Sequence, residues 1–218
     1  MVSIENTVLI LLAAGRSERF GDVGSKLDAD FLGRPLGLHV SVALEAIPFR
    51  ARVAVTGRVG IDYAAYGYDV VPTDDPRAQM SHSVRLGVEA AERHGADAVL
   101  IALADMPRVT ATHIHRLFDA AKGRDDIVIA SSDGRETKPP GLFGRSRFDF
   151  LKAMTGDQGG RDLVRSGRHV VTAPAELIDV DTPEQLERLR ALVGSREAIT
   201  RPEPASVAPI RGEAHRSD

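Results

Sequence analysis

The sequence predicts a single-domain α/β protein with a Rossmann-like, doubly wound and mostly parallel sheet. Three observations predict it. Short apolar runs are too continuous for half-exposed strands, helical patterns lie between them, and a length of 218 residues suits one domain. Continuous apolar runs are typical of strands buried on both faces, and alternation of strands with helices is typical of a parallel sheet. We place this domain in residues 1–194.

The expected strands are the apolar runs in the order in which they occur. They are Val8–Ala14, Arg52–Val55, Asp69–Val71, Ala98–Ala104, Ile127–Ala130 and Leu177–Val180. Two helices are expected between them, Ser83–His94 and Thr110–Lys122, because each has an apolar face and stops at a glycine.

A last helix is predicted by Thr182-Pro183-Glu184-Gln185. Thr182 can cap the helix, Pro183 suits its first turn, and Gln185 completes a capping box. After Gly194 the sequence is rich in Pro, Ser, Ala and charged residues and has no periodic apolar face. We therefore expect residues 195–218 to form a disordered tail.

The composition excludes several classes of function. Lys and Arg number 28 against 31 Asp and Glu, so a formal charge of −3 gives no bulk attraction to nucleic acid or to an anionic membrane. The absence of cysteine excludes disulfides, a thiolate nucleophile and cysteine-based metal sites. The longest apolar run, Val8–Ala14, is too short to span a bilayer, and no signal peptide is recognisable. We expect a soluble, cytoplasmic protein.

The segment Gly15–Gly21 follows the first strand, where ligands bind in open α/β sheets. The small residues Ala13, Ala14 and Gly15 allow close approach to a backbone rich in N–H donors. Arg16, Arg19 and Lys26 supply cations for phosphates. The dinucleotide fingerprint is excluded because Ser17 occupies the position of its second glycine, and the Walker pattern does not occur. The segment is therefore either a different phosphate loop or an ordinary surface turn.

Two aspartates follow apolar runs directly, Asp105 after Ala98–Ala104 and Asp181 after Leu177–Val180. Carboxylates at neighbouring strand ends could hold Mg²⁺ against phosphate oxygens. The alternative is that each aspartate only caps the helix after it. His113 and His115 lie two apart on a predicted helix and face different sides, so we assign them no metal.

Three segments together resemble the MobA-like NTP transferases, and among them the molybdenum cofactor cytidylyltransferases most. These segments are LAAGRSERFG with Lys26, LADMP, and IDVDTPEQL, in the family's order. The resemblance implies a fold like that of the nucleotide-diphospho-sugar transferases. It also implies a Mg²⁺-dependent nucleotidyltransferase that moves CMP from CTP to a molybdopterin-type cofactor phosphate and releases pyrophosphate.

The same resemblance implies roles for individual residues. Arg16, Lys26 and Asp105 would be catalytic, and Asp105 and Asp181 would bind the metal. The nucleotide would contact Leu12, Ala13, Ala14, Gly15, Arg16, Ser17, Lys26, Asp75, Ser81, Ser83 and Asp105.

The family pattern also bears on the substrates. The Ala13-Ala14-Gly15 form favours CTP over GTP, because guanylyltransferase members usually have two glycines there. Three positions depart from the pattern. Asp75 replaces an asparagine, Pro139 replaces a histidine on the side where relatives hold the acceptor, and Asp28 replaces an apolar residue.

The expected partners are CTP or GTP, a molybdopterin-type phosphorylated acceptor and a molybdoenzyme that receives the product, with no nucleic acid and no membrane. The alternatives within the enzyme class are a GTP-using guanylyltransferase and a cytidylyltransferase for sugar or methylerythritol phosphate. The alternative from another class is a catalytically weakened relative that carries the cofactor.

Overall fold

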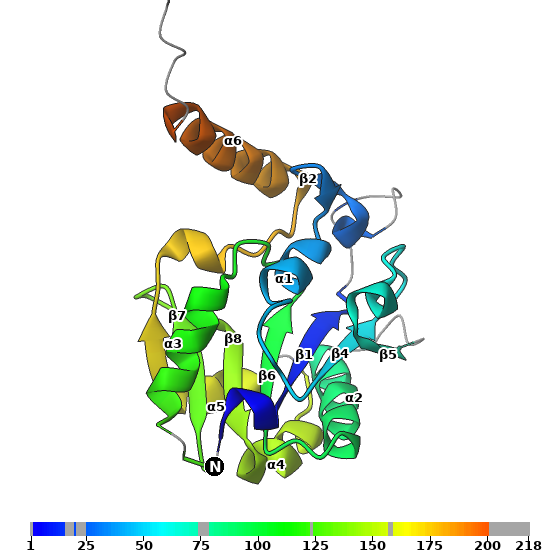
Figure 1. The fold of residues 1–218 in the computed structure, drawn as a ribbon, viewed down its shortest axis with the longest axis vertical. Helices are drawn as coiled ribbons and strands as arrows, with labels where there is room; N and C mark the ends of the chain where they lie inside the picture. The colour runs from blue at the N-terminus through cyan, green and yellow to red at the C-terminus, as the bar shows by residue number, and fades with distance from the viewer. Residues whose placement is uncertain are drawn as a thin grey trace, which may run out of the picture.

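The main sheet of the described residues has seven strands in the order β5-β4-β1-β6-β8-β7-β9 (Figure 1). The computed structural model describes residues 2–15, 20, 25–73, 79–122, 124–156 and 159–200, without the side chains of 159–162 and 195–200. The strands are β1 Thr7–Ala13, β4 Ala51–Thr56, β5 Asp69–Pro72, β6 Ala98–Leu103, β7 Val128–Ser132, β8 Thr137–Gly144 and β9 Arg168–Val171.

The sheet is mostly parallel, as expected. Strand β1 pairs in parallel with β4 and β6, β4 with β5, and β7 with β9, whereas β8 runs antiparallel to both β6 and β7. The carboxyl ends of the parallel strands therefore share one edge of the sheet, and the amino end of β8 lies at that same edge. Residues that follow β1 and β6 are brought next to residues that begin β8.

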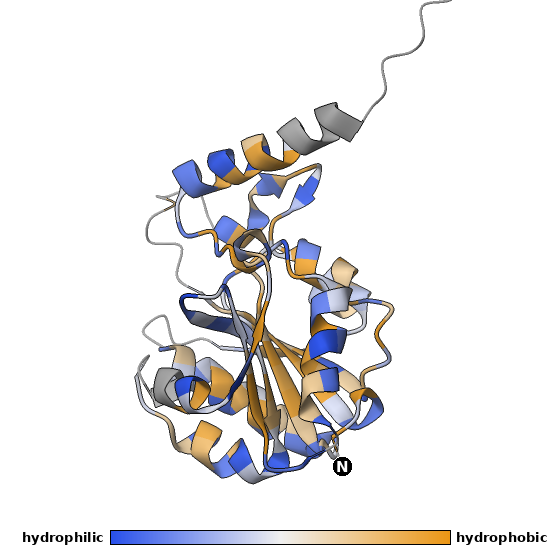
Figure 2. Cartoon of the chain, turned by 90° about the vertical axis from the view of Figure 1, so that its left-hand side faces the viewer, coloured by the Kyte–Doolittle hydropathy of each residue, from blue (hydrophilic) through white to orange (hydrophobic). Residues whose placement is uncertain are grey.

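Helices cover both faces of the sheet, which confirms the doubly wound arrangement. They are α1 Leu38–Ala43, α2 Met80–Arg93, α3 Ala111–Ala121, α4 Phe148–Ala153, α5 Gly159–Ser166 and α6 Pro183–Thr200. Alternate residues of β1 point to opposite faces. Leu9 and Leu11 pack in one cluster with residues of α1 and α3, and Val8 and Ile10 pack in another with residues of α2 and α4. Figure 2 shows the strands as the apolar centre between helices of mixed hydropathy.

A smaller unit lies above the carboxyl ends of the strands (Figure 1). It consists of the hairpin β2 Asp30–Phe31 and β3 Arg34–Pro35 together with α6. Its own cluster of buried side chains contains Phe31, Leu36, Val180, Leu186 and Leu189. This unit places α6 and the residues just before it next to the edge where a ligand is expected.

The predicted strand Leu177–Val180 is wrong. Pro174–Leu177 forms a 3-10 helix, and Ile178–Val180 has no strand pairing. Strand β9 pairs with β7 in parallel and occupies the position beside it. The segment Ile178–Val180 therefore passes the sheet without pairing with a strand. Leu177 and Val180 are nevertheless fully buried and Ile178 is half-buried, which explains why this apolar run resembles a strand in the sequence.

The sequence did not predict β8, which contains Pro139, Pro140 and Gly141. The register against β7 jumps from Ala130–Gly141 to Ser131–Lys138, so both prolines fall in an irregularity outside the ladder. Proline has no N–H to donate, and such an irregularity is where a strand tolerates it.

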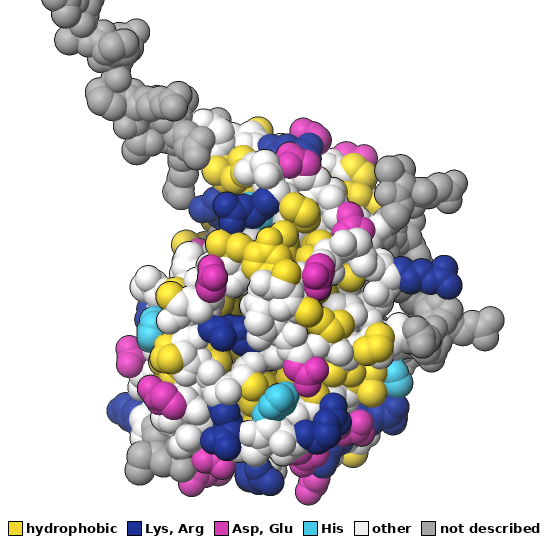
Figure 3. Space-filling model, turned by 45° about the vertical axis from the view of Figure 1, so that its right-hand side comes forward, with side chains coloured by type: hydrophobic (Ala, Val, Ile, Leu, Met, Phe, Trp, Pro, Cys, Tyr) yellow, Lys and Arg dark blue, Asp and Glu magenta, His cyan; other side chains and the backbone are white. Residues whose placement is uncertain are grey.

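Helix α6 runs to Thr200, six residues beyond the boundary expected at Gly194, and the rest of the predicted tail, 201–218, lies outside the described residues. Within the described part of the chain, no helix is both long enough and apolar enough to cross a membrane. Acidic and basic side chains are interspersed on the face shown in Figure 3. The cytoplasmic location stays a prediction.

Candidate active site

The loop after β1 and the turn after β6 lie side by side. The two strands are paired neighbours with Leu12 opposite Leu103, and Ala104 N–H donates to Leu12 O at 3.1 Å. Leu12 and Ala13 end β1, and Ala14 and Gly15 follow it. No atom of the described residues lies within 4 Å of the position that a Cβ would take on Gly15. The described part of the chain therefore leaves this side of the Gly15 backbone accessible.

Lys26 joins the two predicted metal aspartates. Its Nζ donates to Asp105 Oδ2 at 2.6 Å and to Asp181 Oδ1 at 2.8 Å. Lys26 begins a 3-10 helix, Lys26–Asp28, whose first turn is capped by the Ser25 hydroxyl, which accepts from Leu27 N–H. The residue is only 4% exposed, so its ammonium lies beneath the surface of this edge.

Burial and charge oppose each other at this cluster. Burial alone would lower the pKa of Lys26, but the charge of Asp105 and the hydrogen bonds to both carboxylates raise it above its ordinary value. The pKa of Asp105 is raised by burial, Lys26 opposes that shift, and the charges of Asp181 and Asp179 add to it. Lys26 is therefore held as a cation among carboxylates that repel one another.

Hydrogen bonds of the main chain hold Asp181 in place from both sides. Val180 N–H donates to Asp105 O at 3.0 Å, which ties the two aspartate segments together directly. The predicted capping box is confirmed, because Gln185 N–H donates to Thr182 Oγ1 at 3.2 Å and Thr182 N–H donates to Gln185 Oε1 at 2.9 Å. Asp181 N–H also donates to Gln185 Oε1, at 2.6 Å. Asp181 lies at the start of α6, but it follows an irregular segment instead of a strand.

The carboxylates of Asp105 and Asp181 suit a metal ion that a bound ligand also coordinates. Asp105 Oδ1 is buried and has no hydrogen-bond partner among the described residues. Those residues contain no group of three or more His, Cys, Asp or Glu that could hold a metal by themselves. Mg²⁺ is typically bound by one or two carboxylates together with substrate phosphates, and the pair formed by Asp105 and Asp181 has that composition.

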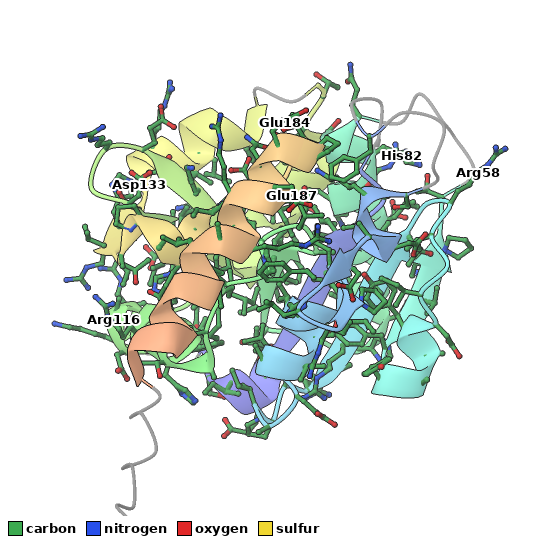
Figure 4. All side chains as sticks on the ribbon, turned by 90° about the horizontal axis from the view of Figure 1, so that it is seen from above. Arg58, His82, Arg116, Asp133, Glu184 and Glu187 are labelled. Carbon is green, nitrogen blue, oxygen red and sulfur yellow. The ribbon has the colours of Figure 1, made fainter. Side chains whose placement is uncertain are left out.

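A second charged group lies beside the first and was missed from the sequence. Lys138 Nζ lies 3.9 Å from Asp133 Oδ2 and 3.8 Å from Asp179 Oδ1. Asp179 is two residues before Asp181, so the D-x-D spacing was the available signal, whereas Lys138 depends on the unpredicted β8. Seen from above in Figure 4, Asp133 lies on one side of α6 and His82 on the other.

The start of α2 borders a small cavity of about 170 Å³, whose lining includes Ser81, His82, Arg85 and Thr155. Ser81 is 8% exposed and Ser83 is 6% exposed. Ser83 is not among the lining residues. The structure thus puts one of the two predicted serines at an opening near the carboxyl edge of the sheet. Arg16, Ser17 and Asp75 lie outside the described residues, and their roles stay predictions.

Asp28 and His113 have hydrogen-bond partners within the fold. The carboxylate of Asp28 accepts the Gly60 N–H at 2.9 and 3.0 Å, which ties the Lys26 segment to the loop after β4. His113 is buried, and its Nε2 lies 2.7 Å from Ser131 Oγ, which donates to Pro140 O at 2.7 Å. Because the Ser131 proton goes to Pro140, His113 Nε2 must donate.

Comparison with known proteins identifies the family of this chain. The model of the MobA-like NTP transferase domain matches residues 9–172. The purine catabolism protein PucB of Bacillus subtilis is 31% identical over 198 residues, which cover 83% of this chain and 94% of PucB. The phosphoenolpyruvate guanylyltransferase of Conexibacter woesei is 29% identical over 178 residues, which cover 76% of this chain and 77% of that enzyme.

Solved structures of similar proteins have the same fold. The crystal structure of Rv0371c from Mycobacterium tuberculosis has a TM-score of 0.70 and 26% identity, and the match covers 87% of this chain and all of that one. A structure of the same protein in complex with manganese has a TM-score of 0.63, with 85% and 98% covered. The chain belongs to the MobA-like NTP transferase family and is a nucleotidyltransferase.

Proposed function

We propose that this nucleotidyltransferase is a Mg²⁺-dependent cytidylyltransferase that transfers CMP from CTP to the phosphate of a molybdopterin-type cofactor. The observation that supports it best is the cluster at the carboxyl edge of the sheet. Lys26 lies there between Asp105 and Asp181, beside the Ala13-Ala14-Gly15 loop. A cation, two carboxylates and a phosphate loop suit the transfer of a nucleotide between two phosphates.

The proposed reaction exchanges one bond for another. An oxygen of the acceptor phosphate forms a bond to the α-phosphorus of CTP, and the bond from that phosphorus to the β-phosphate oxygen breaks. Pyrophosphate leaves with the electron pair. Positioning and charge stabilisation are sufficient for such a transfer, so no covalent nucleophile is needed.

Each charged residue has a proposed part. Asp105 and Asp181 would hold Mg²⁺, which neutralises phosphate charge when it is bound. Two observations support a divalent ion here: Asp105 Oδ1 has no hydrogen-bond partner in the described part of the chain, and the Rv0371c complex contains manganese. Lys26 would keep the carboxylates together before the substrate binds and then neutralise the transferred phosphate. Arg16 would add a second cation, and Ser17, Asp75, Ser81 and Ser83 would contact the nucleotide.

The acceptor would enter on the β8 side. The nucleotide residues come from β1 and α2, and in-line displacement brings the acceptor from the side opposite the leaving group. In the sheet, β6 lies between β1 and β8, so Lys138 of β8 lies on the other side of β6, which Asp105 follows, from the nucleotide residues of β1. Its contacts of 3.8 and 3.9 Å exceed hydrogen-bond length, so its ammonium has no hydrogen-bond partner in the described part of the chain. It is therefore available to an acceptor phosphate.

The choice of substrates rests on the motifs and relatives. The Ala13-Ala14-Gly15 form supports CTP, and the guanylyltransferase among the relatives makes GTP the alternative. PucB is described as a purine catabolism protein, and xanthine is a purine, which agrees with delivery of the product to a xanthine-dehydrogenase-like molybdoenzyme. Sugar phosphates and methylerythritol phosphate are the alternative acceptors. A carrier protein is disfavoured because it needs neither the metal carboxylates nor the buried lysine.

The test is to incubate the protein with each of the four NTPs, Mg²⁺ and molybdopterin while pyrophosphate is measured. We expect release with CTP alone. Release with GTP alone would replace CTP by GTP, and no release with any NTP while the cofactor binds would favour the carrier. Asp105→Asn should abolish release with the fold intact, as checked by circular dichroism. An unchanged rate in that variant would contradict the metal assignment.

A further inference from the structure

A second group of cations surrounds a cavity at the opposite edge of the sheet. This arginine cavity has a volume of about 340 Å³, and its charged lining residues are Arg124, Asp126, Arg147 and Arg168. It lies at the amino ends of β7 and β9, where α3 and α5 end. Three guanidinium groups and one carboxylate leave a net charge of +2 around the opening.

The arginine cavity is separate from the candidate active site. Val128, at the start of β7, is level with Phe143 of β8 and therefore with Val99 of β6. Asp105 lies beyond the other end of β6, after Leu103. The four residue-to-residue steps from Val99 to Leu103 alone span roughly 13 Å at 3.3 Å per step. A ligand of this cavity would therefore not contact Lys26 or Asp105.

Arg147 and Arg168 have more N–H donors than partners among the described residues. Arg147 Nη2 donates to Asp126 O at 3.3 Å, but its Nε is buried and has no partner among the described residues. Arg168 Nη1 donates to Ala120 O at 2.9 Å. A guanidinium has five N–H donors, so these two contacts use a small part of what Arg147 and Arg168 offer. An unpartnered buried donor is costly, and an anion would relieve that cost.

Arg124 differs from the other two, because its charge is already matched. Its Nε and Nη2 donate to the two carboxylate oxygens of Asp126, each at 3.1 Å. This pair is exposed, with 70% of the Arg124 side chain and 60% of the Asp126 side chain accessible. Asp126 therefore offsets the charge of Arg124, whereas the half-buried Arg147 and the exposed Arg168 supply positive charge that no carboxylate of the described lining residues matches.

The floor of the cavity is apolar. Ile127, Val128 and Ile129 of the β7 segment are buried, and Leu163 of α5 also lines it. Gly167 allows α5 to end close to the sheet, because a Cβ there would lie 2.6 Å from Val128 O. A volume of this size suits a small molecule with an apolar body and one anionic group.

We propose that the arginine cavity binds a phosphorylated small molecule, with the phosphate on Arg147 and Arg168 and an apolar or aromatic body on the β7 floor. Guanidinium groups bind phosphate and carboxylate oxygens in pairs. A tetrahedral phosphate presents oxygens in several directions, which suits two arginines that approach from different elements, the turn Arg145–Arg147 and β9.

The experiment is calorimetric titration of the full chain with phenyl phosphate in a buffer free of phosphate. We expect a Kd of about 1 mM or tighter. Inorganic phosphate, which lacks the apolar body, and benzoate, which lacks the tetrahedral anion, should bind several-fold more weakly. Absence of binding by phenyl phosphate would overturn the proposal, and equal binding of benzoate would overturn the choice of phosphate.

Substitutions locate the bound anion. Arg147→Met should weaken binding on the order of tenfold or more, because it removes charged hydrogen bonds. Asp126→Asn should tighten it, because the cavity loses its only carboxylate among the described lining residues. A purely structural role for Asp126 would not produce tighter binding. Arg116→Ala is the matched control, since Arg116 also donates to a backbone carbonyl, Val171 O, but does not line the cavity.

Circular dichroism of each variant checks that the fold is kept. If Arg147→Met fails to fold, Asp126→Asn still decides, because its exposed side chain tolerates an amide. An unchanged Kd in Asp126→Asn, or an equal loss in Arg116→Ala and Arg147→Met, would show that phenyl phosphate binds elsewhere and would overturn the proposal.

Discussion

Replacing Lys26 by Met leaves two carboxylates at the carboxyl edge without the cation that lies between them. Lys26 Nζ is 2.6 Å from Asp105 and 2.8 Å from Asp181, and the residue is 4% exposed. Removal of one partner of a fully buried ion pair costs about 3–5 kcal/mol. The side chains of Asp105 and Asp181 are 17% and 41% exposed, so water screens part of the repulsion. We expect the free energy of unfolding to fall by about 2–4 kcal/mol.

The assay is urea unfolding with EDTA present, so that no divalent ion replaces the ammonium. Far-UV circular dichroism is the signal of choice, because the chain has no tryptophan. Lys152→Met is the matched control. Lys152 also contacts two carboxylates, Glu92 at 2.9 Å and Asp149 at 3.2 Å, but its side chain is 26% exposed and that of Asp149 is 98% exposed. Its loss should be much smaller.

A double-mutant cycle separates the ion pair from simple loss of packing. Lys26→Met should cost clearly less in the Asp105→Asn background, because the repulsion between carboxylates is already removed there. The same loss in both backgrounds, or equal losses for Lys26→Met and Lys152→Met, would refute the reasoning. Pyrophosphate release should fall on the order of 100-fold in Lys26→Met, because a group that stabilises transferred charge is gone.

Three further predictions test packing, titration and the acceptor side. Gly87→Ala should destabilise the protein, since the added Cβ would lie 2.5 Å from Ile10 Cγ2. Gly194→Ala should stabilise α6 by about 1 kcal/mol, since no atom of the described residues lies within 4 Å of the added Cβ. The reverse order of urea midpoints would contradict the packing of α2 on β1. Burial lowers the pKa of His113 below 6.5, so the unfolded chain binds the proton more readily and stability should fall as the pH drops through that value. His113→Gln should reduce this slope without abolishing it, because burial lowers the pKa of His39 as well, and an unchanged slope between pH values of about 8 and 5 would count against the assignment. Lys138→Met should raise KM for the phosphorylated acceptor and leave KM for the nucleotide unchanged, and steady-state kinetics showing the opposite split would move Lys138 to the nucleotide side.

Local patterns explain what could be predicted about the site. Asp105 was expected at the edge of the sheet because an apolar run ends just before it, and the capping box at Thr182 was visible in four consecutive residues. These signals need only neighbours in the sequence. The strand predicted at Leu177–Val180 is wrong because local signals are insufficient there. A short apolar run indicates burial but not which element the residues join.

The sequence by itself determined the class of fold, the reaction type suggested by its motifs, and the residue types available for it. Only the tertiary structure decided that Lys26 lies between Asp105 and Asp181, which are 79 and 155 residues away from it. It also decided that β8 brings Lys138 to the same edge, and that Arg147 and Arg168 line one cavity at the opposite edge. These meetings depend on the order and direction of strands, which are set by packing of the whole chain, and no local periodicity encodes them.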